Sequence, residues 1–446
     1  MAGLSLSPDE QAMLDGSAGE AVALAMRLVV GVARANGAER LLSIESVHVD
    51  GCLYHGQAGL DLAERLVDLG GKVAVRTTLN VGSLDLLHPG LVRADAGLAA
   101  GGRRLMDAYL ALGCEPTWTC APYQSAGSSG HRPAFGSHVA WAESNAIAFV
   151  NSVLGARTDR YGDFLDIAAA LTGRVPAAGL HLDVERQPVL VLDCSAVAPD
   201  LWQQDTSWAA LGAVLGEVAG TRVAAITGVP GSLDDGVTED RLKALGATAA
   251  SAGGVALFHV VGVTPEAKQF HNIGCETVAD RTLQHSASNS FTASVVKLPV
   301  HRVISADLRA ARDRLSTATD DRLDAVSLGT PHFSVAEFAA LAREVGDGQR
   351  FVVPFFVSTS RAVLAEATRL GHVTPLEAAG ARIVTDTCTY VTPVLAPGVR
   401  TVMTSSGKWA WYAPGNLGVD TVLGTLAECV DSARAGKVVR DDPLWD

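Results

Sequence analysis

The pattern of apolar and polar positions predicts helices and strands in alternation along most of the chain. Amphipathic or apolar runs with helical periodicity cover about 20–36, 58–69, 104–112, 137–154, 208–219, 239–252, 334–345, 360–370 and 418–435. Shorter apolar runs that end in turn residues predict strands at about 41–49, 72–79, 222–226, 255–263, 324–328, 351–357, 382–385 and 400–404. This alternation is typical of a layered α/β fold with mostly parallel sheets flanked by helices.

Polar side chains follow the predicted strands of the last third of the chain. The four segments are Gly329-Thr330-Pro331-His332, Ser358-Thr359-Ser360, Thr385-Asp386-Thr387-Cys388 and Thr404-Ser405-Ser406-Gly407-Lys408. Ligands of open α/β sheets collect outside the carboxyl ends of the strands. The recurring polar strand ends therefore predict a single site.

Length and charge narrow the class of protein. The chain has 446 residues, enough for two or three domains, and a formal net charge of −13 with no block of Lys and Arg. The acidic balance argues against nucleic acid and anionic membrane surfaces as partners. Asp9 and Glu10 stand where a signal peptide needs positive charge, and the apolar run 21–35 contains Arg27 and Arg34. We expect a cytoplasmic protein that does not bind a membrane.

Seven cysteines are too few for a disulfide scaffold in a chain of this length. Cys52, Cys120 and Cys388 stand in loops at the ends of apolar runs, where their thiols can converge on one cleft and hold iron or an iron–sulfur centre. Their spacing is a weak signal, because no CxxC or compact cluster motif is present and a buried cysteine usually serves packing. Packing is the role expected for Cys114, Cys194 and Cys429, whereas Cys275 in a polar run stays an open ligand candidate.

Other polar residues near these motifs have simpler alternatives. No HxH or HExxH spacing supports a metal role for the histidines, so we expect hydrogen-bonded core or loop residues at His48, His55, His88 and His332. Carboxylates that stand beside the motifs can support the site or merely cap local backbone: Asp50, Glu143 and Asp386. No phosphate-binding loop follows a strand, so a nucleotide cofactor is not supported.

Several segments together closely resemble the aconitase X family. Besides the loops of Cys52, Cys120 and Cys388, they are Thr77-Thr78-Leu79-Asn80, the run from Ala140 to Asn145, the run from Asn151 to Thr158, and the run from Ser405 to Gly415. The resemblance runs from the first helix almost to the C-terminus, with the motifs in the family's order. It implies an aconitase-like catalytic body and a hydro-lyase activity. Family members include cis-3-hydroxy-L-proline dehydratases and archaeal mevalonate 5-phosphate dehydratases, both with an iron–sulfur cluster.

By this resemblance, Cys120 and Cys388 match cluster-ligand positions. The archaeal pattern has a third cysteine in a Gly-Cys-Pro-His turn, where this chain has threonine at position 330. We infer that Cys52 supplies the missing thiolate, which favours a smaller cluster such as 2Fe–2S and the hydroxyproline branch.

The resemblance also indicates which residues contact the substrate. They are Gly51, Leu53, Asn80, Val81, Asn145 and Lys408. A buried lysine suits a carboxylate or phosphate clamp and can stabilise developing negative charge, so Lys408 is the candidate catalytic residue. The alternatives are a solvated lysine at a strand end, and asparagines that cap local backbone.

The expected reaction is loss of water from a small β-hydroxy acid, with cis-3-hydroxy-L-proline giving Δ1-pyrroline-2-carboxylate. Residues 1–446 are expected to form one catalytic region of two or three α/β subdomains. The family's swivelling small lobe is expected on a separate small subunit, which can supply a serine base. Three alternatives remain: a mevalonate 5-phosphate dehydratase large subunit, a metal-binding protein without turnover, and a thiol-dependent enzyme with Cys120 as nucleophile.

Overall fold

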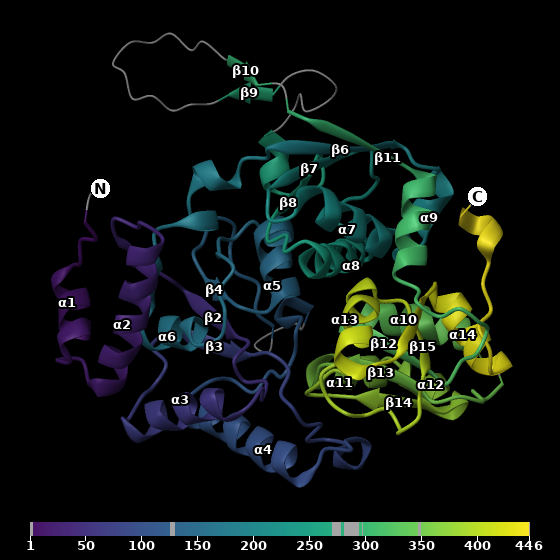
Figure 1. Cartoon of the computed structure of the whole chain (residues 1–446), viewed down its shortest axis with the longest axis horizontal. Coiled ribbons are helices and arrows are strands. Elements are labelled where there is room, and N and C mark those ends of the chain that lie inside the picture. The colour runs from purple at the N-terminus through teal and green to yellow at the C-terminus, as the bar shows by residue number, and fades with distance from the viewer. Residues whose placement is uncertain are drawn as a thin grey trace.

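The chain folds into three α/β units, each built on a parallel sheet (Figure 1). The computed structural model describes residues 3–124, 130–269, 278–280, 294–296, 298–346 and 349–445. Within this part, no single helix is long and apolar enough to cross a bilayer, although the bent helix pair α1 and α2 passes a test of length and composition. Parallel sheets with helices on their faces confirm the predicted fold class.

The first unit holds a three-stranded parallel sheet of order β3-β2-β4, with β2 between its neighbours. Its strands are β2 (Ser46–Val49), β3 (Arg76–Leu79) and β4 (Ala140–Trp141), and a separate antiparallel pair joins β1 (Leu41–Ser43) to β5 (Arg174–Pro176). The helices are α1 (Pro8–Asp15), α2 (Glu20–Ala35), α3 (Gln57–Asp68), α4 (Ala96–Ala111), α5 (Ser144–Phe149) and α6 (Leu165–Thr172). A capping box of Ser7 and Glu10 starts α1.

The second unit is a four-stranded parallel sheet of order β11-β6-β7-β8. Its strands are β6 (Leu190–Ala196), β7 (Ala224–Thr227), β8 (Phe258–Val260) and β11 (Val300–Ile304), and its helices are α7 (Asp205–Ala219), α8 (Gly236–Ala252) and α9 (Ser305–Arg314). Helices α7 and α8 pack closely against each other because small residues face the contact. A Cβ at Gly212 would lie 2.4 Å from the backbone oxygen of Leu245. Between β8 and β11, a short antiparallel pair joins β9 (Val278–Asp280) to β10 (Ser294–Val296).

The third unit is a five-stranded parallel sheet of order β14-β13-β12-β15-β16. Its strands are β12 (Ala325–Phe333), β13 (Phe355–Thr359), β14 (Ala381–Val384), β15 (Thr401–Thr404) and β16 (Asp420–Leu423). The helices are α10 (Val335–Val345), α11 (Arg361–Arg369), α12 (Val373–Ala379), α13 (Gly407–Leu417) and α14 (Leu426–Ala435). The strands are buried on both faces, as expected for a parallel sheet covered by helices.

The carboxyl ends of the first and third sheets face each other. Thr385, directly after β14, donates through its backbone N–H to Asp85 Oδ2 at 2.9 Å. Gly82, shortly after β3, donates through its N–H to the Asp386 carbonyl at 2.7 Å. Polar strand ends from two sheets therefore meet in one place, and the single site predicted at such ends lies at the junction of the units.

Three predicted elements are wrong in part. The run 41–49 is not one strand but two, β1 and β2, which belong to different sheets. The run 137–154 is not one helix: it contains β4, then α5, then a π-helical turn at Val150–Leu154. Glu143 rather than Ser137 caps the helix, because its carboxylate accepts the Ala146 N–H at 2.7 Å. The run 418–435 is a strand followed by a helix, β16 and α14, and α13 was not predicted at all.

Candidate metal centre

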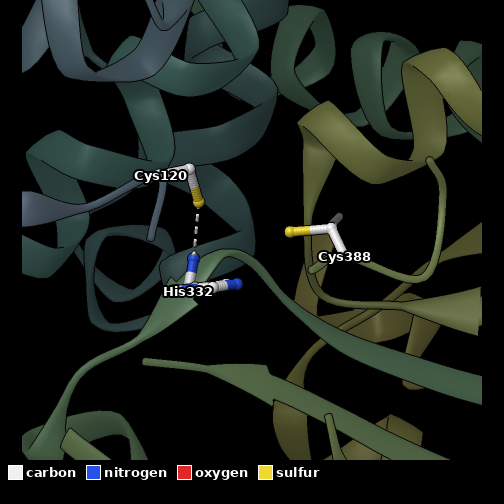
Figure 2. Close-up of side chains that lie close together, drawn as sticks. All are labelled: Cys120, His332 and Cys388. Atoms are coloured by element: carbon white, nitrogen blue, oxygen red, sulfur yellow. Dashed lines mark hydrogen bonds between the residues drawn. The ribbon is translucent and has the colours of Figure 1, made fainter. Parts of the chain in front are cut away.

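Two of the three predicted thiols lie together at this junction. Cys120 comes from the loop after α4, and Cys388 follows β14. One ligand atom each of Cys120, Cys388 and His332 lies within 4.8 Å of the others, and all three residues are buried. Figure 2 shows the two sulfur atoms directed toward the same space from opposite units. A pair of buried thiols from different parts of the chain is a donor set that suits a soft metal centre.

His332 lies beside the thiols, but its ring is already engaged. Nε2 lies 3.1 Å from the Thr387 carbonyl, which only accepts, so Nε2 carries the proton. Nδ1 then accepts from the Thr119 hydroxyl at 3.0 Å. Burial lowers the pKa of His332 to about 4, which keeps the ring neutral. As predicted, His332 is a hydrogen-bonded core histidine. It touches the centre through its backbone N–H, which donates to Cys120 Sγ at 3.2 Å.

The turn before Cys388 is held by charged groups. Asp386 adopts a left-handed backbone with φ of 62°, which is uncommon for a residue other than glycine. Its buried carboxylate accepts two hydrogen bonds from Arg361 at 2.7 and 2.6 Å, and one from the Leu86 N–H at 3.0 Å. This carboxylate therefore serves the site by fixing the turn that directs Cys388 toward Cys120. A hydrogen bond with Cys120 and burial raise the pKa of the Cys388 thiol.

Thr330 occupies the corner where the archaeal pattern has a cysteine. Its neighbour Gly329 has φ of 87°, and a Cβ there would lie 2.1 Å from the Ser358 carbonyl oxygen, so only glycine fits. The buried Thr330 hydroxyl makes no regular hydrogen bond within the described residues. It lies close enough to the Cys388 sulfur to lower the pKa of that thiol. Cys120 and burial raise the same pKa by more. A buried polar atom without a partner at this corner suits a site built around a further group.

Lys408 is buried at the same junction rather than solvated. Its Nζ pairs with the Glu143 carboxylate and donates to Ser144 Oγ at 3.1 Å. The Lys408 side chain, from the third unit, is 4% exposed, and the Glu143 side chain, from the first unit, is 5% exposed. Burial lowers the pKa of Lys408, but Glu143 and other neighbours outweigh it and raise the pKa overall. The pKa of Glu143 is lowered, because Lys408 outweighs the effect of burial. Lys408 is therefore a charged group in a dry setting, as a carboxylate clamp requires.

The other predicted substrate residues line the first-unit side of the junction. Asn145 Nδ2 donates to the Cys120 carbonyl at 3.1 Å and to the Tyr123 hydroxyl at 3.0 Å, while its Oδ1 has no partner within the described residues. Val81 packs against both Cys120 and Cys388. Gly51 is buried and Leu53 half-buried in the loop after β2. Asn80 donates to the Asp50 carboxylate.

Cys52 is buried near the centre but outside the group formed by Cys120, His332 and Cys388. Its thiol donates to the Asn80 carbonyl at 3.4 Å and lies 3.7 Å from the carbonyls of Val49 and Val81. Burial raises the pKa of this thiol. To act as a ligand, the Cys52 sulfur must leave these carbonyls, so its metal role stays a prediction.

The remaining cysteines have separate surroundings. Cys114, Cys194 and Cys429 are buried in the apolar cores of the first, second and third units. Cys275 lies outside the described residues, as does part of the Ser- and Gly-rich stretch after Gln124.

Two carboxylates lie next to the centre in the first unit: Asp50 is half-buried and Asp166 is buried. Burial raises the pKa of Asp50 to about 7, with Glu143 and Asp163 adding repulsion. Burial likewise raises the pKa of Asp166 to about 6. Asp166 serves the backbone, because it accepts the N–H groups of Asp50 and Gly51 at 2.8 and 3.1 Å. The sequence leaves two alternatives for Asp50: support for the site or capping of local backbone.

A cleft opens beside the centre, between the second and third units. It is lined by α8 residues, among them Asp240 and Lys243, and by Thr330, Ser406 and Lys408 of the third unit. Lys243 is fully buried, and Asp240 at 3.0 Å and Glu337 neutralise its charge. Lys408 therefore stands between this cleft and the thiols.

Comparison with known proteins identifies the three units. Residues 3–184 match the Aconitase X first domain, 188–286 the second domain and 323–435 the third domain. The fold also matches a crystal structure of the holo-form of Thermococcus kodakaraensis aconitase X, with a TM-score of 0.80 and 30% identity, over 96% of this chain and all of that chain.

Named relatives fall into two groups. The chain is 40% identical to a cis-3-hydroxy-L-proline dehydratase of Pseudomonas aeruginosa, over its full length and 72% of the relative. It is 37% identical to a protein of the same name from Hypocrea jecorina, over 97% of this chain and 69% of the relative. It is 38% identical to the phosphomevalonate dehydratase large subunit of Methanothermobacter thermautotrophicus, over 94% of this chain and 96% of the relative. The chain belongs to the aconitase X family.

Proposed function

We propose that this chain is the catalytic body of an iron–sulfur hydro-lyase that dehydrates cis-3-hydroxy-L-proline to Δ1-pyrroline-2-carboxylate. The observation that carries the proposal is the meeting of two buried thiols, Cys120 and Cys388, next to the buried charge of Lys408. Similar relatives named as dehydratases support a hydro-lyase activity.

Cys120 and Cys388 are the proposed ligands of the cluster, and Cys52 is the proposed third. The residues present fit such a group, since the thiols converge and the hydroxyl of Thr330 has no regular partner. When bound, the cluster supplies a Lewis acid for the departing hydroxyl. The backbone N–H of His332 steadies the sulfur of Cys120 from the protein side.

Lys408 holds the substrate carboxylate in this proposal. Its ammonium is buried, charged and held in place by Glu143, so it is aligned before the substrate arrives. Negative charge develops on the carboxylate when the neighbouring carbon loses its proton, and a fixed ammonium in a dry site stabilises that charge. Gly51, Leu53, Asn80, Val81 and Asn145 line the proposed pocket.

A second candidate is dehydration of mevalonate 5-phosphate. It is favoured by one observation: the chain covers 96% of an archaeal phosphomevalonate dehydratase large subunit, with 38% identity. The threonine at position 330 speaks against it, because the archaeal pattern has cysteine there.

We further propose that the active enzyme needs a swivelling lobe from a small-subunit partner, which can supply the general base. The support is the large-subunit name of the archaeal relatives. Full turnover by this chain alone would contradict the proposal that a small-subunit partner is needed.

The test is anaerobic reconstitution with iron and sulfide, with and without a candidate small subunit, followed by assay of hydroxyproline isomers and mevalonate 5-phosphate. We expect turnover of cis-3-hydroxy-L-proline, loss of turnover in Cys120→Ser and Cys388→Ser, and normal turnover in Cys429→Ser, whose thiol lies in the third-unit core. Iron binding without dehydration of any hydroxy acid would contradict the proposal and favour a metal-binding protein without turnover.

A further inference from the structure

The buried charges around the substrate residues do not balance. Lys408 is already paired with Glu143. Asp50, at the carboxyl end of β2, adds a half-buried carboxylate, on which Glu143 and Asp163 act as like charges and Lys408 as the opposite one. The described surroundings of Asp50 therefore hold more negative than positive charge. Buried excess charge is costly unless a partner neutralises it.

The carboxylate of Asp50 accepts no hydrogen bond from a backbone N–H within the described residues, whereas that of Asp166 does. Asp166 accepts three backbone N–H groups, those of Asp50, Gly51 and Ile167. Within the described residues, the only hydrogen bond to the Asp50 carboxylate comes from Asn80 Nδ2, to Oδ1. Its second oxygen remains available to a ligand.

Asn80 offers a second acceptor in the same place. Because its Nδ2 donates to Asp50, its Oδ1 is an acceptor, and this buried atom has no partner within the described residues. Asn80 itself is 3% exposed. Unpaired buried acceptors are rare in folded proteins, and each one calls for a donor. Asp50 and Asn80 thus present two free acceptor oxygens side by side, and a cation with two donors would satisfy both and pair with the carboxylate form of Asp50.

We propose that Asp50 and Asn80 form the subsite for a secondary ammonium, the ring nitrogen of an imino acid. This inference rests on the proposed function and goes beyond it, because it assigns the group that recognises nitrogen. A protonated ring nitrogen carries two N–H donors and one positive charge, which matches the two acceptors and the surplus carboxylate. Lys408 takes the carboxylate on the adjacent carbon, so each charge of the zwitterion meets an opposite charge of the protein.

The same arrangement makes Asp50 a specificity-determining residue. A phosphorylated hydroxy acid carries only negative charge and would place it near Asp50 and Glu143, where like charges repel. An imino acid is attracted to the same carboxylates.

The test compares two ligands that differ only in the ring nitrogen: cis-3-hydroxy-L-proline and cis-2-hydroxycyclopentane-1-carboxylate, in which a methylene replaces it. Dissociation constants are measured on the reconstituted holoenzyme, complete with any small subunit. We expect the wild type to prefer the imino acid, and Asp50→Asn to reduce this preference by about 10- to 100-fold, because a charged hydrogen bond is lost. Binding of the carbocycle should change by less than about 3-fold, since it makes no such bond.

Asp163→Asn is the matched control. It likewise removes one negative charge, but from an exposed residue that repels the Asp50 carboxylate. We expect it to change the preference for the imino acid over the carbocycle by less than about 3-fold. Asn80→Ser, which removes the second acceptor, should reduce the preference in part. It decides the question if Asp50→Asn fails to fold.

The outcomes separate the two proposals. A preference that survives in Asp50→Asn, or in Asn80→Ser when the first variant is unfolded, would overturn the ammonium subsite and leave the proposed function standing. An equal loss of both ligands in a folded Asp50→Asn would do the same. A wild-type holoenzyme that neither binds nor dehydrates the imino acid would overturn the proposed function and the subsite with it.

Discussion

Removal of the Glu143 charge tests the buried ion pair that joins the first and third units. Glu143→Gln keeps the shape of the side chain but removes the negative charge from beside the Lys408 ammonium, whose other hydrogen bond goes to the Ser144 hydroxyl at 3.1 Å. Both side chains of the pair are about 95% buried. Breaking such a pair from one side costs about 3–5 kcal/mol, because an uncompensated charge stays buried.

We expect the lower end of this range, about 3 kcal/mol, because the glutamine oxygen still accepts a hydrogen bond. The double variant Glu143→Leu with Lys408→Met removes both charges. It should recover to within about 1 kcal/mol of the wild type, since an apolar replacement of a buried pair is often neutral. The coupling between the two positions follows from urea unfolding of the single and double variants.

The matched control is Glu217→Gln, which breaks the pair with Arg314 on the surface. Those side chains are 45% and 49% exposed, and loss of such a pair costs about 0–1 kcal/mol. A Glu143→Gln variant that unfolds at the same urea concentration as Glu217→Gln would refute the buried, charged state of Lys408. The carboxylate clamp would then lose its physical basis.

Three further predictions concern the centre. Burial raises the pKa of Asp50 to about 7 in the folded chain. Between about pH 4 and pH 7, the folded chain therefore keeps a proton that the unfolded chain has released. The free energy of unfolding falls as pH rises through this range. In urea unfolding, Asp50→Asn should therefore be more stable than the wild type at pH 8, by up to about 4 kcal/mol, and equally stable below pH 4. Equal stability at pH 8 would argue against the raised pKa. Thr330→Cys places a further thiol beside Cys388 and should raise the affinity of the chain for iron, measured in competition with a chelator. An unchanged affinity would show that the side chain at position 330 does not reach the metal. His332→Gln should keep its iron, because the imidazole bonds Thr119 and Thr387 rather than facing the metal; loss of iron as severe as in Cys120→Ser would make the ring a ligand.

The parallel layers and the site at the strand ends could be predicted from the sequence. Capping boxes at Ser7 and Ser334 and short apolar runs are local signals, and the helices and strands they indicate are present. Polar residues after β13, β14 and β15 point to one sheet edge, because parallel strands share their carboxyl ends. The family resemblance then selected Cys388 and Lys408 from that edge, and Cys120 from the loop after α4.

Other features depend on contacts that leave no local pattern. The start of the predicted helix 137–154 is the strand β4, because a short apolar run suits a buried strand as well as a helix. Helix α13 contains Gly407, Pro414 and aromatic residues, which locally resemble a loop, and its buried face packs it as a helix. Glu143 and Lys408 are 265 residues apart, so their pairing exists only in the folded chain.

The most direct test of the metal centre is the iron and acid-labile sulfide content of anaerobically reconstituted chains, measured with the Mössbauer spectrum. We predict a bound cluster in the wild type and in Cys429→Ser, and loss of iron in Cys120→Ser and in Cys388→Ser. Full iron occupancy with an unchanged spectrum in both of these variants would contradict a centre held by the two thiols at the junction.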